Sequence, residues 1–157
     1  MTRANLILAA IAGSAALLAG AFGFEHLGGL QPCQLCIWQR WPHAAAVLIG
    51  VLALLAGKGG AQRLLAGFGG FAAASTAALG AFHAGVEQKW WAGLASCSAG
   101  SVSGISGADL LNTDIVLAPV VRCDAVAWAM FGVSMASWNA LASFGLVVIW
   151  AMAARRS

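Results

Sequence analysis

The sequence predicts an all-α integral membrane protein: a four-transmembrane-helix bundle with two loops on its outer side, the second of them long. Three observations support this prediction. Apolar residues make up 61% of the 157-residue chain and charged residues only 8%, whereas an ordinary soluble domain has about 25% charged residues. Four uncharged stretches approach the roughly 20 residues that a helix needs to cross a bilayer. Lys and Arg gather in segments that would share one side of the membrane.

The four expected spans are rich in Ala, Leu, Val and Gly and contain no charged residue. They cover about 4–24, 41–57, 64–82 and 139–154. None shows the period-two alternation of a membrane barrel strand, so helices are favoured. The first stretch is longer than the 7–15 apolar residues of a secretion signal, which favours a retained helix. We therefore expect one membrane domain over residues 1–157.

The third span carries small residues at four-residue spacing, namely Gly70, Ala74 and Ala78. Small side chains on one helix face allow two helices to approach closely in lipid. The spacing therefore predicts that this face of the third span packs against a neighbouring helix.

The basic residues predict the orientation. Short segments rich in Lys and Arg mark the cytoplasmic side. The N-terminus, the loop between the second and third spans, and the C-terminus contain Arg3, Lys58, Arg63, Arg155 and Arg156. Both termini are therefore expected in the cytoplasm. The outer loops, about 25–40 and 83–138, hold all five acidic residues. Five tryptophans near the outer helix ends predict an aromatic belt: Trp38, Trp41, Trp90, Trp91 and Trp138.

All four cysteines, Cys33, Cys36, Cys97 and Cys123, fall in the two outer loops. Thiols on that side face an oxidising compartment, where disulfides form and persist. Four cysteines allow three pairings. Closing Cys33 with Cys36 forms the shortest loop and would leave Cys97 with Cys123, but the sequence alone leaves the resting pairing open. A Cys-x-x-Cys loop restrains little chain and is a frequent redox site.

The surroundings of Cys36 favour redox chemistry. Cys36 lies near the expected start of the second helix, where unpaired backbone N–H groups favour negative charge. Arg40 follows four residues later on the same helix face. Both features favour a thiolate on Cys36, and a guanidinium at membrane depth suits an anion or the polar head of a cofactor. His83 is a further candidate, whereas the sequence does not decide functional roles for Glu87 and His26.

Metal binding and purely structural roles are the competing interpretations of these residues. Haem attachment would need His after the second cysteine, where Ile37 stands. Zinc held by four cysteines usually shows a second close pair, but Cys97 and Cys123 are far apart in the sequence. We therefore expect no metal. Arg40 could instead be an interfacial anchor, and a Cys97–Cys123 bond could simply restrain the long loop.

Several motifs of the chain together resemble those of one known protein family. The run PCQLCIWQR from Pro32 to Arg40 is similar to the family's Cys-x-x-Cys-x-x-x-Arg signature. The stretch from His83 to Glu87, ahead of Cys97, is similar to a second family motif. A third similarity comprises Arg122, Cys123 and Asp124, with Trp128, Gly132, Met135 and Trp138 before the last helix. The family that these motifs resemble is that of disulfide bond formation protein B (DsbB). The resemblance covers nearly the whole chain, including the number of helices and the placement of the cysteines.

The resemblance implies a thiol oxidase of the bacterial inner membrane whose outer loops are periplasmic. A reduced thioredoxin-like partner of the DsbA type would attack a Cys97–Cys123 disulfide, with Cys97 forming the mixed disulfide. The electrons would pass to Cys33 and Cys36. The oxidised partner would then introduce disulfide bonds into exported proteins.

The resemblance also implies a membrane quinone, either ubiquinone or menaquinone, as the electron acceptor. Cys36 would face the quinone, with Arg40 beside it and His83 as a further quinone-binding residue. A partner of the DsbA type is itself a strong oxidant, with a potential of about −120 mV, so a simple dithiol would reoxidise it poorly unless a quinone removed the electrons. The quinone type, the partner's identity and the oligomeric state are not determined by the sequence.

Two other functions fit part of the sequence. A protein that conducts reducing equivalents outward would need a donor site on the cytoplasmic side, where no cysteine lies. The remaining alternative is a small membrane scaffold or channel subunit with two structural disulfides, which predicts that both bonds resist mild thiols. Nucleic acid is not an expected partner, because the basic residues are few and lie mostly at the cytoplasmic ends of the helices.

Overall fold

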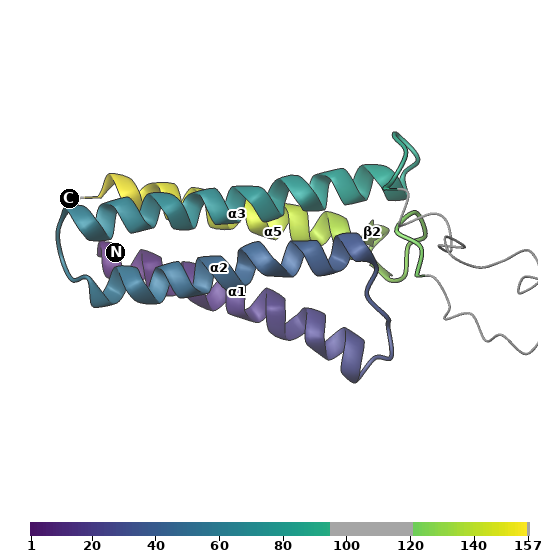
Figure 1. The fold of residues 1–157 in the computed structure, drawn as a ribbon, viewed down its shortest axis with the longest axis horizontal. Helices are drawn as coiled ribbons and strands as arrows, with labels where there is room; N and C mark the ends of the chain where they lie inside the picture. The colour runs from purple at the N-terminus through teal and green to yellow at the C-terminus, as the bar shows by residue number, and fades with distance from the viewer. Residues whose placement is uncertain (95–120, 157) are drawn as a thin grey trace, which may run out of the picture.

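The structure, a computed structural model, describes residues 1–94 and 121–156. Within these residues, helices α1 (Arg3–His26), α2 (Gln34–Leu55), α3 (Gly60–Glu87) and α5 (Met135–Arg155) form the body of the protein (Figure 1). Strands β1 (Ala129–Met130) and β2 (Val133–Ser134) form a short antiparallel hairpin just before α5. All four helices are long and apolar enough to cross a membrane. The predicted all-α bundle of four membrane helices is confirmed.

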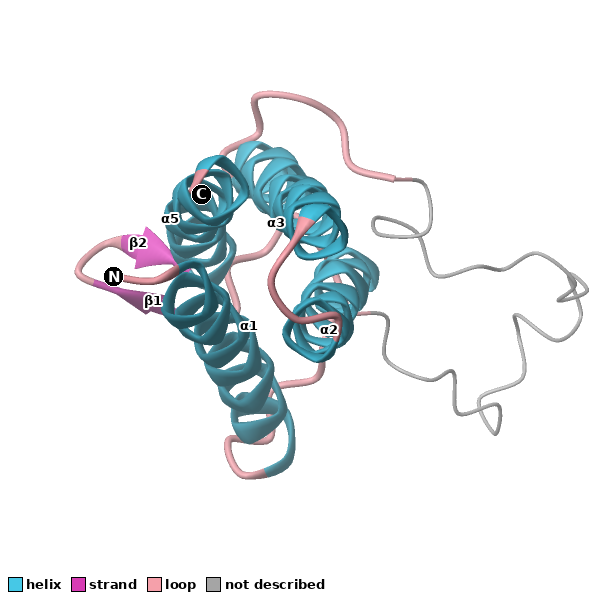
Figure 2. Ribbon diagram, turned by 90° about the vertical axis from the view of Figure 1, so that its left-hand side faces the viewer, coloured by secondary structure: helices cyan, strands magenta, loops and turns pink. Residues whose placement is uncertain are grey.

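The helices pack in a ring. α3 lies between α2 and α5, and α1 closes the ring by contacting α2 and α5 (Figure 2). Both chain termini lie at one end of the bundle, together with the α2–α3 connection (Figure 1). At the opposite end α1 diverges from the other helices as it approaches the loop to α2. The segments that contain Cys33 and Cys123 lie at this divergent end.

The interior of the bundle is built around one large aromatic side chain, Trp150 of α5, which is fully buried. Glycines on two other helices make room for its ring. A Cβ atom added at Gly69 of α3 would lie 2.7 Å from the Trp150 ring, and one added at Gly50 of α2 would lie 3.3 Å from it. Because real Cβ atoms essentially never approach as closely as 2.7 Å, the absence of a side chain at Gly69 allows α3 and α5 to pack closely.

The packing face predicted for α3 was wrong. Of the three residues proposed for it, Ala74 and Ala78 are exposed and Gly70 is only partly buried. The buried stripe lies one position earlier on the helix and includes Gly69, Ala72, Ala73, Thr76 and Gly80. Because α3 is rich in Gly and Ala throughout, spacing alone did not distinguish two neighbouring stripes. In the buried stripe, Gly69 faces the Trp150 ring and Gly80 faces the α5 backbone at Ala136 and Ala140.

Arg3 joins three segments at the end that carries the termini. Its Nε donates to the carbonyl oxygen of Ala153 at 3.2 Å, and its Nη1 donates to that of Gly59 at 3.3 Å. Its Nη2 donates to the carbonyl oxygen of Arg156. These carbonyl groups belong to the end of α5 and to the α2–α3 connection, so one guanidinium links the start of α1 to both.

Candidate functional site

Cys33 and Cys36 lie at the start of α2. Cys33 is the N-cap residue, and its Sγ accepts a hydrogen bond from the backbone N–H of Cys36 at 3.3 Å. Both are free thiols, with their Sγ atoms 2.9 Å apart. The hydrogen bond to Cys36, followed by burial, raises the pKa of the Cys33 thiol well above its usual value. In the dithiol form, the contact with Cys36 and burial therefore favour the protonated thiol at Cys33.

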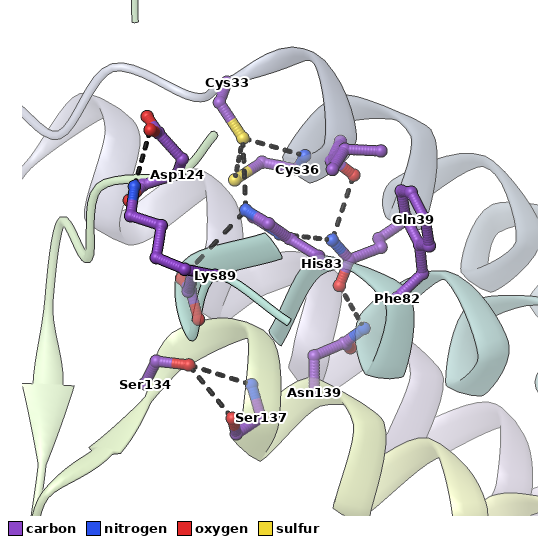
Figure 3. Close-up of polar contacts among 12 residues, drawn as sticks. Cys33, Cys36, Gln39, Phe82, His83, Lys89, Asp124, Ser134, Ser137 and Asn139 are labelled. Atoms are coloured by element: carbon purple, nitrogen blue, oxygen red, sulfur yellow. Dashed lines mark hydrogen bonds and ion pairs between the residues drawn. The ribbon is translucent and has the colours of Figure 1, made fainter. Parts of the chain in front are cut away.

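His83 of α3 reaches the same pair of sulfurs (Figure 3). Its Nε2 lies 3.6 Å from the Sγ of Cys33 and 4.0 Å from Oε1 of Glu87, one turn further along α3. Its Nδ1 lies 3.0 Å from Nε2 of Gln39. Three residues from two helices, His83, Glu87 and Gln39, thus form one buried polar cluster beside the thiols.

Arg40 connects α2 to α1. Its Nη1 forms an ion pair with Oε2 of Glu25, and its Nη2 lies 3.4 Å from the carbonyl oxygen of Ala21. The guanidinium carbon also lies 4.8 Å from the centre of the Phe22 ring. The Arg40 side chain is only 16% exposed. Its Nε is buried without a hydrogen-bond partner among the described residues, so this donor is available to another group.

A cavity of about 300 Å³ opens beside the thiols, where α1 diverges from the bundle. Its walls come from the second half of α1, the start of α2, the end of α3 and the segment 121–139. Most of the lining is apolar. The polar or reactive side chains that line it are Cys33, Cys36, Gln39, Arg40, His43, His83, Glu87 and Asn139, besides Gln31 and Arg122 nearer the loops. Phe24 of α1 packs against Trp128 at 4.9 Å between ring centres, and both residues line the cavity.

Cys123 lies next to the first cysteine pair. It is fully buried, it is disulfide-bonded, and it shares one hydrophobic cluster with Cys33, Leu35 and Val86. Cys97 lies outside the described residues, so the predicted Cys97–Cys123 pairing stays a prediction. The described cysteines of both predicted pairs are nevertheless brought together at one end of the bundle.

Ion pairs hold the residues on either side of Cys123. The carboxylate of Asp124 accepts two hydrogen bonds from Arg122, both at 2.8 Å, and one from Nζ of Lys89 at 2.6 Å. Lys89 also donates to the backbone carbonyl of Asp124 at 2.9 Å. Arg122 and then Lys89 hold the pKa of the Asp124 carboxyl well below its usual value. We call Lys89, Arg122 and Asp124 the Asp124 clamp, because they tie the segment around Cys123 to the end of α3.

The structure brings Cys33, Cys36, Arg40 and His83 together around one cavity. The sequence predicted no functional role for Gln39, His43 or Asn139. All three line the cavity. The signal available in the sequence was the presence of polar side chains within otherwise apolar helices, which are expensive in a membrane and often functional.

The same atoms form a possible set of metal ligands. The Sγ atoms of Cys33 and Cys36 and a ring nitrogen of His83 lie within 4.8 Å of one another. Thiolate and imidazole ligands suit zinc or copper. The expectation that the protein needs no metal therefore stays a prediction.

Comparison with known proteins decides the family. The family model described as "Disulfide bond formation protein DsbB" matches residues 3–153. The chain belongs to the DsbB family. It is 31% identical to the Disulfide bond formation protein B of Azoarcus sp. (strain BH72) over 166 residues, which cover 98% of this chain and 95% of that relative.

Two further relatives agree with this assignment to the DsbB family. The Disulfide bond formation protein B of Polaromonas sp. (strain JS666) is 31% identical over 170 residues, covering 99% of this chain and 95% of the relative. The Disulfide bond formation protein B 2 of Pseudomonas aeruginosa is 32% identical over 144 residues, covering 87% and 82%. No solved structure matches the chain. Membership of the DsbB family, which the motifs had suggested, implies a role in disulfide bond formation.

Proposed function

We propose that this protein oxidises a periplasmic thioredoxin-like protein of the DsbA type and passes the electrons to a membrane quinone. The reaction would sustain disulfide bond formation in exported proteins. Membership of the DsbB family supports the general role. The observation that carries the finer proposal is the position of Cys33 and Cys36 in the wall of an apolar cavity that also contains Arg40 and His83.

The cavity fits the head group of a quinone, a flat apolar ring with two carbonyl oxygens. Binding sites for small molecules are typically apolar with a few polar groups that fix orientation. Here the unpaired Nε of Arg40 offers a buried donor, and His83 and Cys36 line the same space. We infer that Arg40 and His83 orient the ring beside Cys36. When bound, a quinone supplies an acceptor for two electrons and two protons.

Thiol–disulfide exchange would connect the partner to this site. The reduced partner would attack the disulfide of Cys97 and Cys123, and the thiols released there would reduce the bond between Cys33 and Cys36. Exchange requires a thiolate to reach a disulfide sulfur. The burial of Cys123 and Cys33 in one cluster supports this route. Each turnover takes two electrons and two protons from the partner's dithiol, which becomes a disulfide.

We also infer that the cysteine end of the bundle faces the periplasm of a bacterial inner-membrane protein with cytoplasmic termini. At this end, every described Arg or Lys forms an ion pair with an acidic residue, namely Arg40, Lys89 and Arg122. At the other end, Arg3, Lys58, Arg63, Arg155 and Arg156 form no ion pair with the described residues. An excess of Lys and Arg in short segments, here five at this end against three at the cysteine end, is typical of a cytoplasmic side.

Quinone reduction by the purified protein tests the proposal. The protein in detergent would receive a reduced DsbA-type partner and either ubiquinone or menaquinone, and quinol formation would be followed. We expect turnover by the wild type and none by Cys36→Ser, because that variant cannot form the Cys33–Cys36 bond. If no combination of partner and quinone supports turnover and all disulfides resist mild thiols, the scaffold alternative replaces this proposal.

A further inference from the structure

A row of hydrogen bonds leads from Cys33 into the apolar interior of the bundle (Figure 3). His83 approaches the Cys33 sulfur and, through its other ring nitrogen, lies 3.0 Å from Nε2 of Gln39. Oε1 of Gln39 accepts a hydrogen bond from Nδ2 of Asn139 at 2.7 Å. Oδ1 of Asn139 in turn lies 3.0 Å from Nε2 of His43. The row joins side chains of α2, α3 and α5.

Two contacts with carbonyl or hydroxyl groups fix the direction of this row. The carbonyl oxygen of Leu35 can only accept, and it lies 2.9 Å from the side-chain nitrogen of Gln39. Rotating the Gln39 amide by half a turn would bring two oxygens together, so its nitrogen faces Leu35 and His83. The Thr76 hydroxyl donates to the backbone oxygen of Gln39 at 3.2 Å and can therefore accept from Nδ2 of Asn139 at 3.3 Å. Both amide orientations follow from the network.

The direction of the row assigns the tautomer of His83. An amide nitrogen only donates hydrogen bonds, so Nδ1 of His83 must accept one from Gln39. A neutral imidazole then carries its proton on Nε2, the nitrogen that lies 3.6 Å from the Cys33 sulfur. Gln39 and His83 are 6% and 3% exposed, so water offers little competition for these contacts. The hydrogen bond that Nδ1 accepts from Gln39 thus determines that Nε2 carries a proton on the side of the thiols.

We propose that Gln39 and Asn139 are positioning residues that hold His83 in the Nε2–H tautomer, with this N–H directed at the sulfur of Cys33. The proposal rests on the thiol oxidase function proposed above. Reduction of the Cys33–Cys36 disulfide breaks the S–S bond and brings in two electrons and two protons. When thiol–disulfide exchange releases the Cys33 sulfur as a thiolate, the Nε2–H of His83, 3.6 Å away, and the backbone N–H of Cys36, 3.3 Å away, would stabilise its negative charge until it takes up the proton that the dithiol keeps.

The substitution Gln39→Glu tests the proposal most directly. A carboxylate only accepts hydrogen bonds, so it would draw the imidazole proton to Nδ1 and leave a lone pair facing Cys33. Gln62→Glu is the matched control, because Gln62 is also a buried glutamine but lies in the first turns of α3, at the other end of the bundle. Asn139→Leu is a second variant, which removes the donor to Gln39 without adding charge.

The first readout is the ¹⁵N spectrum of histidine-labelled protein, with the His83 signals identified by their loss in His83→Ala. We expect the protonated nitrogen to be Nε2 in the wild type and in Gln62→Glu, but Nδ1 in Gln39→Glu. In Asn139→Leu the Leu35 carbonyl still holds the Gln39 nitrogen towards His83, so the proton should stay mainly on Nε2, with a weaker preference than in the wild type. A wild-type spectrum with the proton on Nδ1 would overturn the proposal, whatever the activity of the protein.

The second readout is the reaction of the Cys33–Cys36 pair. Gln39→Glu removes the hydrogen bond from His83 to the Cys33 thiolate. Because hydrogen bonds to charged groups are strong, its loss should slow partner-driven reduction of this disulfide by about 10- to 100-fold. The reduction potential of the pair should become more negative in Gln39→Glu, while the potential and the rate of Gln62→Glu stay at wild-type values. An unchanged potential and rate in a folded Gln39→Glu would also overturn the proposal. Wild-type protein that reduces no quinone would refute the oxidase function but leave the spectra to decide the tautomer.

Discussion

Around Cys33 and Cys36, single side chains join helices whose ends are far apart in the sequence. Arg40 reaches from α2 to Glu25 of α1, and its Nε stays without a partner among the described residues. The ion pair with Glu25 holds the Arg40 side chain in place, and its unpaired Nε can donate a hydrogen bond to a bound quinone, as proposed above. The burial of Arg40 speaks against the alternative in which it is only an interfacial anchor, because a snorkelling side chain keeps its charged head in water.

We expect Arg40→Ala to lower quinone-dependent turnover by about tenfold or more, since a buried charge-assisted hydrogen bond would be lost. The KM for quinone should rise, while the helical circular dichroism spectrum stays unchanged. Arg63→Ala is the control, because Arg63 is exposed at the opposite end of the bundle. Wild-type kinetics in Arg40→Ala would remove Arg40 from the quinone site.

The Asp124 clamp predicts a specific pH dependence. A carboxyl whose pKa is lowered in the folded state stabilises that state fully at pH values above its unfolded pKa of about 3.9. This stabilisation is lost as the pH falls further, through the lower pKa of the folded state. We therefore expect the difference in unfolding temperature between wild type and Asp124→Asn to be constant from pH 8 to about pH 5. The difference should shrink only below about pH 4. A difference that changed near neutral pH would contradict the assignment to Asp124.

Among the helices, the contact of α3 with α5 depends on one glycine position. Gly69 lies against the ring of Trp150, whereas a Cβ at Gly67, two residues earlier, would meet nothing within 4 Å. The two glycines share a helix and a residue type but differ in their surroundings. Substituting each with alanine therefore separates packing from helix propensity.

Gly69→Ala should destabilise the bundle by about 1–3 kcal/mol, because the added methyl group overpacks the interior against Trp150. Gly67→Ala should stabilise it by about 0.5–1 kcal/mol, because alanine loses less backbone entropy in a helix. Chemical unfolding in detergent micelles measures both changes. Equal effects of the same sign would show that Trp150 does not limit the approach of α3.

The helices could be predicted because they depend on local composition. The helix contacts and the polar network were harder to predict, because they depend on how the helices pack. Long uncharged stretches predicted four membrane helices, and the four-residue spacing from Cys36 to Arg40 placed these two residues on one helix face, about one turn apart. The buried stripe of α3 was misplaced because its burial depends on contacts with α5, which the sequence of α3 does not reveal. The row through Gln39 and Asn139 joins residues on different helices, and a single sequence does not reveal which polar side chains will meet.

At the scale of the whole molecule, the distribution of charge divides the bundle into two ends. Exposed Lys58 lies in the connection between α2 and α3, and Leu27, 92% exposed, lies in the loop that leads to Cys33. These positions mark the two ends without belonging to the cavity. They allow the proposed orientation to be measured directly.

In a variant with all four native cysteines replaced by serine, we expect Leu27→Cys to react with a membrane-impermeant maleimide added to intact spheroplasts. Lys58→Cys should react only after the membrane is opened, because the positively charged end faces the cytoplasm. The opposite labelling pattern would reverse the proposed orientation. Labelling of both positions in intact spheroplasts would instead argue against a four-span arrangement.

Because both termini lie at the end away from the thiols (Figure 1), they are suitable attachment points for work on the reaction itself. A tag fused to either terminus would hold the protein on a solid support or an electrode with the cysteine end turned outward. Partner proteins in solution would then meet the redox-active thiols without passing the tag. Immobilisation through residues near Leu27 should, by contrast, block that approach.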